Sequence, residues 1–337
     1  MAPKLILVTG VNGFIGAHIA EQLLERGYRV RGTARGEKYD TLVETVNKPG
    51  LDFVKISDVA EADFTEALNG VDAIIHTACP LAGRKNLDET FKTSIEGTMN
   101  LVRQANKAGV RKIVATSSFG ALLSPSFAKV FSGDNITESD WSEVTDEEFE
   151  KNKENPYYIY FTAKSRTEKA LLEFGKQHPE FDIVSILPGY VLGPYARTFP
   201  FPTAVPAFGT NEDVYQLISK GPIAFAPNWF VDVRDVAKAH IVALEATNLP
   251  ADKKRFIINA GTRTWKQIAE HLKSVKPEVK DRIISLDEAT PLPGPSSDLD
   301  STRARELLGV ADYIPLEKTL DDTVNDLLML EKAWDKN

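Results

Sequence analysis

The residues best suited to chemistry are a tyrosine and a lysine one helical turn apart, Tyr160 and Lys164. A spacing of four puts both side chains on one face of a helix. A phenol has a pKa of about 10, so it donates a proton well at neutral pH, and a nearby ammonium lowers that pKa. Tyr160 could therefore protonate a carbonyl oxygen as hydride reaches the carbonyl carbon, and accept the proton back in the reverse reaction.

A hydroxyl partner for this pair follows the apolar run Lys112–Ala115, which we expect to be a strand. The run continues into Thr116, Ser117 and Ser118, at the carboxyl edge where parallel sheets bind ligands. A serine hydroxyl there can hydrogen-bond a developing alkoxide. We predict that Ser118 has this role. Ser117 is the alternative, because the two face opposite ways along an extended chain.

A glycine-rich loop, Thr9–Gly16, joins the first expected strand to the first expected helix. In such a loop Gly10 permits a tight turn, Gly13 lets the backbone approach a pyrophosphate, and Gly16 lets the helix pack on the strand. The N-terminus of the helix then presents unpaired N–H groups to the phosphates. The loop predicts a dinucleotide cofactor.

The end of the second expected strand indicates which nicotinamide cofactor binds. An acidic residue about 20 positions past the loop would bond the ribose 2′-hydroxyl of NAD, whereas arginine accommodates the 2′-phosphate of NADP. Residues 31–38 contain no acidic residue before Glu37. Arg35 is the natural phosphate ligand and Lys38 a helper, so we predict NADP. A solvated loop arginine is the alternative.

The elements that must position these residues alternate in period through the first half of the chain. Short apolar or β-branched runs alternate with segments of helical spacing, which predicts βαβ units. We therefore expect an α/β fold with a doubly wound parallel sheet of the Rossmann type, covered on both faces. The expected strands are 5–8, 28–33, 51–56, 73–76, 112–115, 181–187 and 255–259. The expected helices are 17–26, 63–69, 87–108, 158–176, 233–245, 301–308 and 316–333.

The texture changes at residue 188, because 188–227 hold seven of the nineteen prolines. We expect this stretch to be mostly loop, laid over the sheet edge as a lid. The dinucleotide-binding domain would comprise 1–187 and 232–260, and a smaller, mostly C-terminal substrate-binding lobe would comprise 188–231 and 261–337. Six aromatic side chains could wall an apolar pocket or equally serve packing: Tyr195, Phe199, Phe201, Phe208, Phe225 and Trp229.

Composition excludes several classes of protein. The formal charge of −8 over 337 residues argues against nucleic-acid or anionic-membrane partners. A single cysteine, Cys79, excludes an intrachain disulfide. We see neither a signal sequence nor the roughly 20 apolar residues of a membrane helix, and expect a cytoplasmic monomer or homodimer. The five histidines form no metal-like cluster, and His76 is expected to be structural, so no metal site is predicted.

Together these motifs resemble the extended branch of the short-chain dehydrogenase/reductase family, and within it the dihydroflavonol reductase-like aldehyde and ketone reductases. Further matching stretches are Asp58, 76–78, 187–194, 231–237 and 301–309. One departure is Ser94, where many relatives carry an asparagine. If that asparagine supports a water relay behind the lysine, the relay here is changed or absent.

The resemblance implies roles for several residues. Asp58 would bond the adenine amine, and Lys164 would hold the nicotinamide ribose hydroxyls as well as tune Tyr160. Pro188 and Val191 would contact the nicotinamide carboxamide. Ser118 rather than Ser117 would take the catalytic position. The full set of expected cofactor contacts is Gly10, Asn12, Gly13, Phe14, Ile15, Gly16, Arg35, Lys38, Asp58, Val59, Thr77, Ala78, Thr116, Ser117, Tyr160, Lys164, Pro188 and Val191.

The sequence thus predicts an NADP-dependent reductase that transfers hydride from NADPH to the carbonyl of an aldehyde, ketone or dihydroflavonol-like small molecule. One alternative is a nucleotide-sugar epimerase or dehydratase on the same scaffold. It would need cations for a diphosphate, yet Arg197 and Lys220 are the only basic residues between Pro188 and Val231. A second alternative, a non-catalytic NADP-binding sensor, would not need the Tyr160–Lys164 pair.

Overall fold

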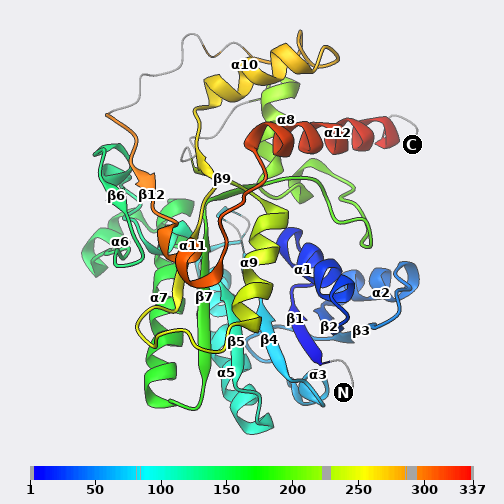
Figure 1. Cartoon of the computed structure of the whole chain (residues 1–337), viewed down its shortest axis with the longest axis vertical. Helices are drawn as coiled ribbons and strands as arrows, with labels where there is room; N and C mark the ends of the chain where they lie inside the picture. Colours follow the sequence, from blue (N-terminus) through cyan, green and yellow to red (C-terminus); the bar gives the residue numbers. More distant parts are fainter. Residues whose placement is uncertain are drawn as a thin grey trace.

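A seven-stranded parallel sheet, in the order β10-β7-β5-β4-β1-β2-β3, forms the centre of the computed structural model (Figure 1). The structure describes residues 4–80, 82–83, 85–221, 229–284, 286 and 294–334. The sheet strands are β1 (Leu5–Thr9), β2 (Arg29–Ala34), β3 (Leu51–Lys55), β4 (Ala73–His76), β5 (Lys112–Thr116), β7 (Asp182–Pro188) and β10 (Arg255–Ile258). The predicted doubly wound parallel sheet is confirmed.

Helices cover both faces of the sheet because its strands are apolar on both sides. Alternate residues of a strand point to opposite faces. Ile6 and Val8 of β1 accordingly join one hydrophobic core, and Leu5 and Leu7 join another. The first core is closed by α1 (Phe14–Glu25), α9 (Val233–Glu245) and α11 (Thr302–Leu308). The second is closed by α3 (Thr65–Leu68), α5 (Gly97–Ala108) and α7 (Pro156–Gln177).

Several helical segments differ from the sequence-based expectation, and α6 (Asp146–Asn152) and α10 (Trp265–Val275) are among those not predicted. The single helix expected over 87–108 is divided into α4 (Leu87–Phe91), a π-helical segment η1 (Lys92–Glu96) and α5. Such π-segments often occur at functional sites. The short helix α2 (Gly36–Thr45) was not predicted at all, because it is largely exposed and buries only Leu42. An exposed helix leaves little apolar periodicity in the sequence.

The stretch expected to be mostly loop also contains regular structure. Strand β8 (Tyr190–Leu192) pairs with β9 (Trp229–Asp232), which pairs with β11 (Gly261–Thr262). Helix α8 (Asn211–Ser219) shares a hydrophobic core with α10 (Trp265–Val275) and α12 (Leu316–Trp334). Figure 1 shows these three helices grouped at one end of the molecule. The prolines around α8 hid the helical spacing of Val214, Leu217 and Ile218.

The C-terminal chain does not stay within that group of helices. Strand β12 (Asp298–Leu299) pairs with β6 (Asn135–Ile136), and Ala304 and Leu308 of α11 pack in the same core as β1. The expected domain boundaries stay a prediction. The remaining short elements are η2 (Phe119–Ala121), η3 (Ala128–Phe131), α6 (Asp146–Asn152) and η4 (Val205–Ala207). No helix within the described ranges is long and apolar enough to cross a membrane.

Candidate active site

The glycine loop follows β1 at the carboxyl edge of the sheet. Gly10 has a φ of +69°, in the left-handed region that favours glycine. A Cβ on Gly16 would lie 2.3 Å from the Gly10 carbonyl oxygen, so only glycine allows α1 to approach the strand this closely. Gly13 is the N-cap of α1, and its N–H donates to Gly10 O at 2.9 Å. The loop therefore has the compact geometry that the sequence predicted for Gly10 and Gly16.

The glycine loop packs against the segment that follows β4. Phe14 and Ile15 begin α1 and are half-buried, as is Asn12. The hydroxyl of Thr77 donates to Thr9 O at 2.7 Å. A Cβ on Gly10 would lie 3.1 Å from the backbone of Ala78. The two segments are in direct contact.

Tyr160, Lys164 and Ser118 come together at the ends of α7 and β5. Ser118 is buried, lies close enough to Tyr160 to lower the pKa of its phenol, and accepts from Gly120 N–H at 3.0 Å. Ser117 turns the other way, and its hydroxyl donates to Glu168 Oε2 at 2.8 Å. This arrangement supports Ser118 over Ser117 as the serine that faces a substrate.

The environment of Tyr160 keeps its phenol protonated at neutral pH. Burial raises the pKa of Tyr160, whereas Lys164 and the hydrogen bond with Ser118 lower it without fully offsetting the burial. The lysine effect predicted from the sequence is therefore present but is outweighed by desolvation. A protonated phenol is the form that can donate a proton.

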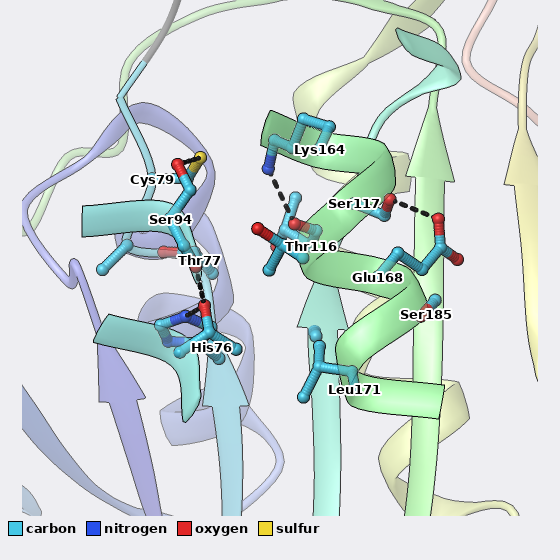
Figure 2. Close-up of a pocket in the computed structure, with 14 residues that line it drawn as sticks. His76, Thr77, Cys79, Ser94, Thr116, Ser117, Lys164, Glu168, Leu171 and Ser185 are labelled. Atoms are coloured by element: carbon cyan, nitrogen blue, oxygen red, sulfur yellow. Dashed lines mark hydrogen bonds between the residues drawn. The ribbon is translucent and has the colours of Figure 1, made fainter. Parts of the chain in front are cut away.

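Lys164 is buried, and its Nζ donates to the carbonyl oxygen of Thr116 at 3.0 Å (Figure 2). Burial by itself would lower the pKa of Lys164, but Cys79 and Tyr160 beside it more than offset this and leave the pKa above its ordinary value. Lys164 is thus a fixed ammonium next to the phenol. The sulfur of Cys79 in turn lies 3.3 Å from Ser94 Oγ, in the π-helical segment η1.

Two buried neutral histidines brace the ends of β4 and β5. His240 Nδ1 bonds the Val236 carbonyl at 2.7 Å, so its Nε2 accepts from the Thr116 hydroxyl, also at 2.7 Å. His76 Nε2 bonds Thr98 Oγ1 at 2.9 Å, and its Nδ1 bonds Thr9 Oγ1 at 2.7 Å. The contacts support the structural role expected for His76. No local pattern pointed to the role of His240, because its partner Thr116 is 124 residues away in the sequence.

These histidines should make folding pH-dependent. Burial lowers the pKa of His76 and of His240 to about 4. In the unfolded chain both histidines take up a proton below about pH 6.5, whereas in the folded chain they do so only near pH 4. As the pH falls from about 6.5 to 4, each histidine should therefore lower the free energy of unfolding by up to ~1.4 kcal/mol per pH unit. Asp235, whose pKa burial raises to about 6, works in the opposite direction below pH 6.

Urea denaturation at pH 7, 6 and 5 measures the effect. We expect the free energy of unfolding to fall steadily from pH 7 to pH 5. His76→Gln, which removes one of the two titrating groups, should make the slope shallower by ~1.4 kcal/mol per pH unit. A stability that is constant or increases on acidification would contradict the assignment of both histidines as buried and neutral.

The residues expected to hold the adenosine end lie beyond β2 and β3. Arg35, the N-cap of α2, and Lys38 are exposed at the carboxyl end of β2. Asp58 Oδ1 accepts from Ala60 N–H at 3.0 Å. Val59 is buried against Gly97, where a Cβ would lie 3.0 Å from Val59 Cγ1. Both cations are thus open to an anionic ligand at the predicted place.

The two residues that we expect to contact the nicotinamide lie on β7 and β8. Pro188 is the last residue of β7, and Val191 is buried in β8, where its carbonyl accepts from the Thr210 hydroxyl. Among the residues that the structure describes, no three or more histidine, cysteine, aspartate or glutamate side chains are grouped so that they could hold a metal ion.

Most aromatic candidates for the pocket wall pack instead into hydrophobic cores. Tyr195 and Phe208 lie in the core shared by α8, α10 and α12, and Phe199 lies in the core beneath α1 and α9. Trp229 is fully buried, and its Nε1 donates to Ser297 O at 2.7 Å. These contacts support the packing alternative for those four rings. Phe201 is only partly buried, and Phe225 lies outside the described residues.

Comparisons with known proteins agree with this geometry. Residues 6–261 match the model of the NAD dependent epimerase/dehydratase family, and the chain belongs to that family. It is 31% identical to the ketoreductase azaE of Aspergillus niger over 98% of each chain. It is 32% identical to the dihydroflavonol 4-reductase of Callistephus chinensis, over 86% of this chain and 78% of that one.

A solved structure is also similar to the chain along nearly its full length. The crystal structure of the yeast methylglyoxal/isovaleraldehyde reductase Gre2 complexed with NADPH superposes with a TM-score of 0.83 at 26% identity, covering 97% of this chain and 99% of that chain. These relatives confirm the resemblance to the extended, dihydroflavonol reductase-like short-chain dehydrogenases/reductases.

Proposed function

We propose that the protein is an NADP-dependent reductase that transfers hydride from NADPH to the carbonyl of an aldehyde, ketone or dihydroflavonol-like small molecule. The observation that carries the proposal is the cluster of Tyr160, Lys164 and Ser118 at the sheet edge beside the glycine loop. The similarity of the chain to a ketoreductase, a dihydroflavonol 4-reductase and a methylglyoxal/isovaleraldehyde reductase complexed with NADPH supports the same chemistry.

The residues present fit the cofactor. Glycines at positions 10, 13 and 16 carry no Cβ at the turn where α1 begins. A pyrophosphate can therefore approach the backbone N–H groups at the N-terminus of this helix. Arg35 and Lys38 supply cations for a 2′-phosphate. Asp58, Lys164, Pro188 and Val191 would hold the remaining parts. When bound, NADPH supplies the hydride.

The chain itself supplies the proton and holds the resulting charge. Tyr160 donates its phenolic proton to the carbonyl oxygen, and Ser118 hydrogen-bonds the same oxygen. The phenolate left on Tyr160 is stabilised by the Lys164 ammonium and by the Ser118 hydroxyl, the two groups that lower its pKa. Lys164 stays in place because the Thr116 carbonyl accepts one of its protons.

Contacts in the structure count against a nucleotide-sugar substrate. Arg197 NH2 is 2.7 Å from the buried carboxylate of Asp326, and its guanidinium lies over the ring of Phe201. Lys220 is exposed just beyond the end of α8. Because Arg197 is committed to Asp326, only Lys220 is left for a sugar diphosphate in this stretch. A cytoplasmic location and a monomeric or homodimeric state stay predictions.

A substrate screen tests the proposal. NADPH consumption should be measured with aldehydes, α- and β-keto esters and flavanonols, with nucleotide diphosphate sugars as competitors. We expect turnover of at least one carbonyl class and no inhibition by the sugars, because Arg197, one of the two basic residues between Pro188 and Val231, is already paired with Asp326. Tight binding of a nucleotide sugar without reduction of any carbonyl would instead support the epimerase alternative.

A further inference from the structure

The proposed mechanism leaves unused a buried carboxylate, Glu168, one helical turn beyond Lys164 on α7. Glu168 is 2% exposed. Its Oε2 accepts from Ser117 Oγ at 2.8 Å, and its Oε1 accepts from Arg255 Nε at 2.9 Å (Figure 2 shows the bond to Ser117). A carboxylate this deeply buried is costly unless it is paired and hydrogen-bonded, so its partners must hold a strict geometry.

Arg255, on β10, is itself fixed from several sides. Its NH1 donates to the carbonyl of Asp140 at 3.0 Å, and its guanidinium lies 3.5 Å from the ring centroid of Trp141. Because Arg255 cannot shift, it fixes Glu168 against the sheet. Glu168 in turn is fixed relative to the rest of the rigid helix α7.

Three successive residues at the end of β5 each lie against a different side chain of α7. The Thr116 carbonyl accepts from Lys164, the Ser117 hydroxyl donates to Glu168, and Ser118 lies close enough to Tyr160 to lower the pKa of its phenol. The first and third contacts involve the reacting groups themselves. The middle contact is the one that must stay unchanged while Tyr160 loses and regains its proton.

Packing between α7 and β5 is incomplete beside this contact. A cavity of about 20 Å³ lies beside Lys164 and is lined also by Ser117, Glu168, Leu171 and Ser185. That volume is roughly one water molecule. Side chains that border a cavity are held less tightly by packing than close-packed ones. A directional contact between α7 and β5 therefore adds a constraint at this point.

We propose that Glu168 is a positioning residue, which through its hydrogen bond from Ser117 sets the register of α7 against β5 and so places Tyr160 and Lys164 opposite Ser118. The proposal rests on the proposed reductase function. Besides Glu168, the titratable groups that face Lys164 are Tyr160 on α7, Cys79 after β4, His76 on β4 and His240 on α9. A change at Ser117 alters none of these groups chemically.

Ser117→Ala is the main test, in the full chain with a carbonyl substrate that the wild type reduces. We expect kcat to fall by about 10- to 100-fold, because a small misplacement of catalytic groups has effects of that size. The Kd for NADPH should change much less than kcat, because Lys164 keeps its ammonium while Arg35, Lys38 and the glycine loop are untouched. The alkaline limb of the kcat–pH profile should move to higher pH, because a less well placed Lys164 lowers the pKa of Tyr160 less.

Ser165→Ala is the matched control. Ser165 is a buried serine next to Lys164 on the same helix, but its hydroxyl donates to Ser142 O at 3.1 Å, away from the cluster. It should keep kcat and the pH profile of the wild type. Ser117→Thr, which retains the hydroxyl, should restore activity. Glu168→Gln, which retains an acceptor for Ser117, should keep more kcat than Glu168→Ala.

Two outcomes would overturn the proposal and are distinguishable. If Ser117→Ala loses no more kcat than Ser165→Ala, Glu168 is only structural, while the reductase function stands. If the wild type binds NADPH but reduces no carbonyl, the proposed function fails and the positioning role fails with it. Should Glu168→Ala not fold, the Ser117 and Ser165 variants still decide the question.

Discussion

Tyr160→Phe should lower kcat for carbonyl reduction by about 10²- to 10⁴-fold, the usual contribution of a positioned acid. The substitution deletes the phenolic proton and keeps the ring, which packs at 6.1 Å from Phe161. It leaves Lys164 bonded to the Thr116 carbonyl. The Kd for NADPH should therefore be nearly unchanged.

Lys164→Ala provides the contrast. It removes both the ammonium that stabilises the phenolate and a proposed cofactor contact, so kcat and the NADPH Kd should both suffer. Steady-state kinetics and equilibrium titration with NADPH, on the wild type and both variants, measure the two effects separately. If Tyr160→Phe retains more than half of wild-type turnover, Tyr160 is not the proton donor.

Arg35→Asp should reverse the choice of cofactor. Arg35 is exposed at the carboxyl end of β2, and its planar guanidinium can bond two oxygens of a 2′-phosphate at once. Losing one charge-assisted hydrogen bond costs about 1.5–3 kcal/mol, which weakens NADPH binding about 10- to 100-fold. The new aspartate also repels the phosphate and offers an acceptor to the NADH ribose. The ratio of kcat/KM for NADPH over NADH should collapse or invert.

Lys48→Asp is the matched control for this charge reversal. Lys48 is also exposed, but it lies just before β3, at the amino ends of the strands and away from the carboxyl ends where Arg35 lies. It should leave the cofactor ratio close to that of the wild type. A wild type that already prefers NADH, or an Arg35→Asp ratio equal to that of Lys48→Asp, would show that Arg35 is only a solvated loop residue.

The sheet could be predicted from the sequence because most of its strands are short apolar or β-branched runs. Leu5–Thr9 is buried along its whole length, and Arg255–Ile258 likewise. Elements with weak periodicity could not be predicted. Helix α2 buries one residue, and α8 is surrounded by prolines that indicated a loop.

The reacting groups could be chosen from local spacing, whereas the contacts that hold them could not. Tyr160 and Lys164 are four residues apart, so one helix brings them together. Glu168 meets Arg255 from 87 residues away, and Thr116 meets His240 from 124 residues away. Such pairs become neighbours only through the strand order β10-β7-β5, which no local pattern contains. The choice of Ser118 over Ser117 likewise gained its physical support from the bond between Ser117 and Glu168.

Isotope transfer tests the central claim most directly. The purified protein should be incubated with NADPH deuterated at the transferable position and with a carbonyl compound found active in the screen, and the product analysed by mass spectrometry. A reductase yields an alcohol that carries one deuterium on the former carbonyl carbon, in step with the NADPH oxidised, and Tyr160→Phe forms it far more slowly. An unlabelled product, or epimerisation of a nucleotide sugar without net oxidation of NADPH, would contradict the account.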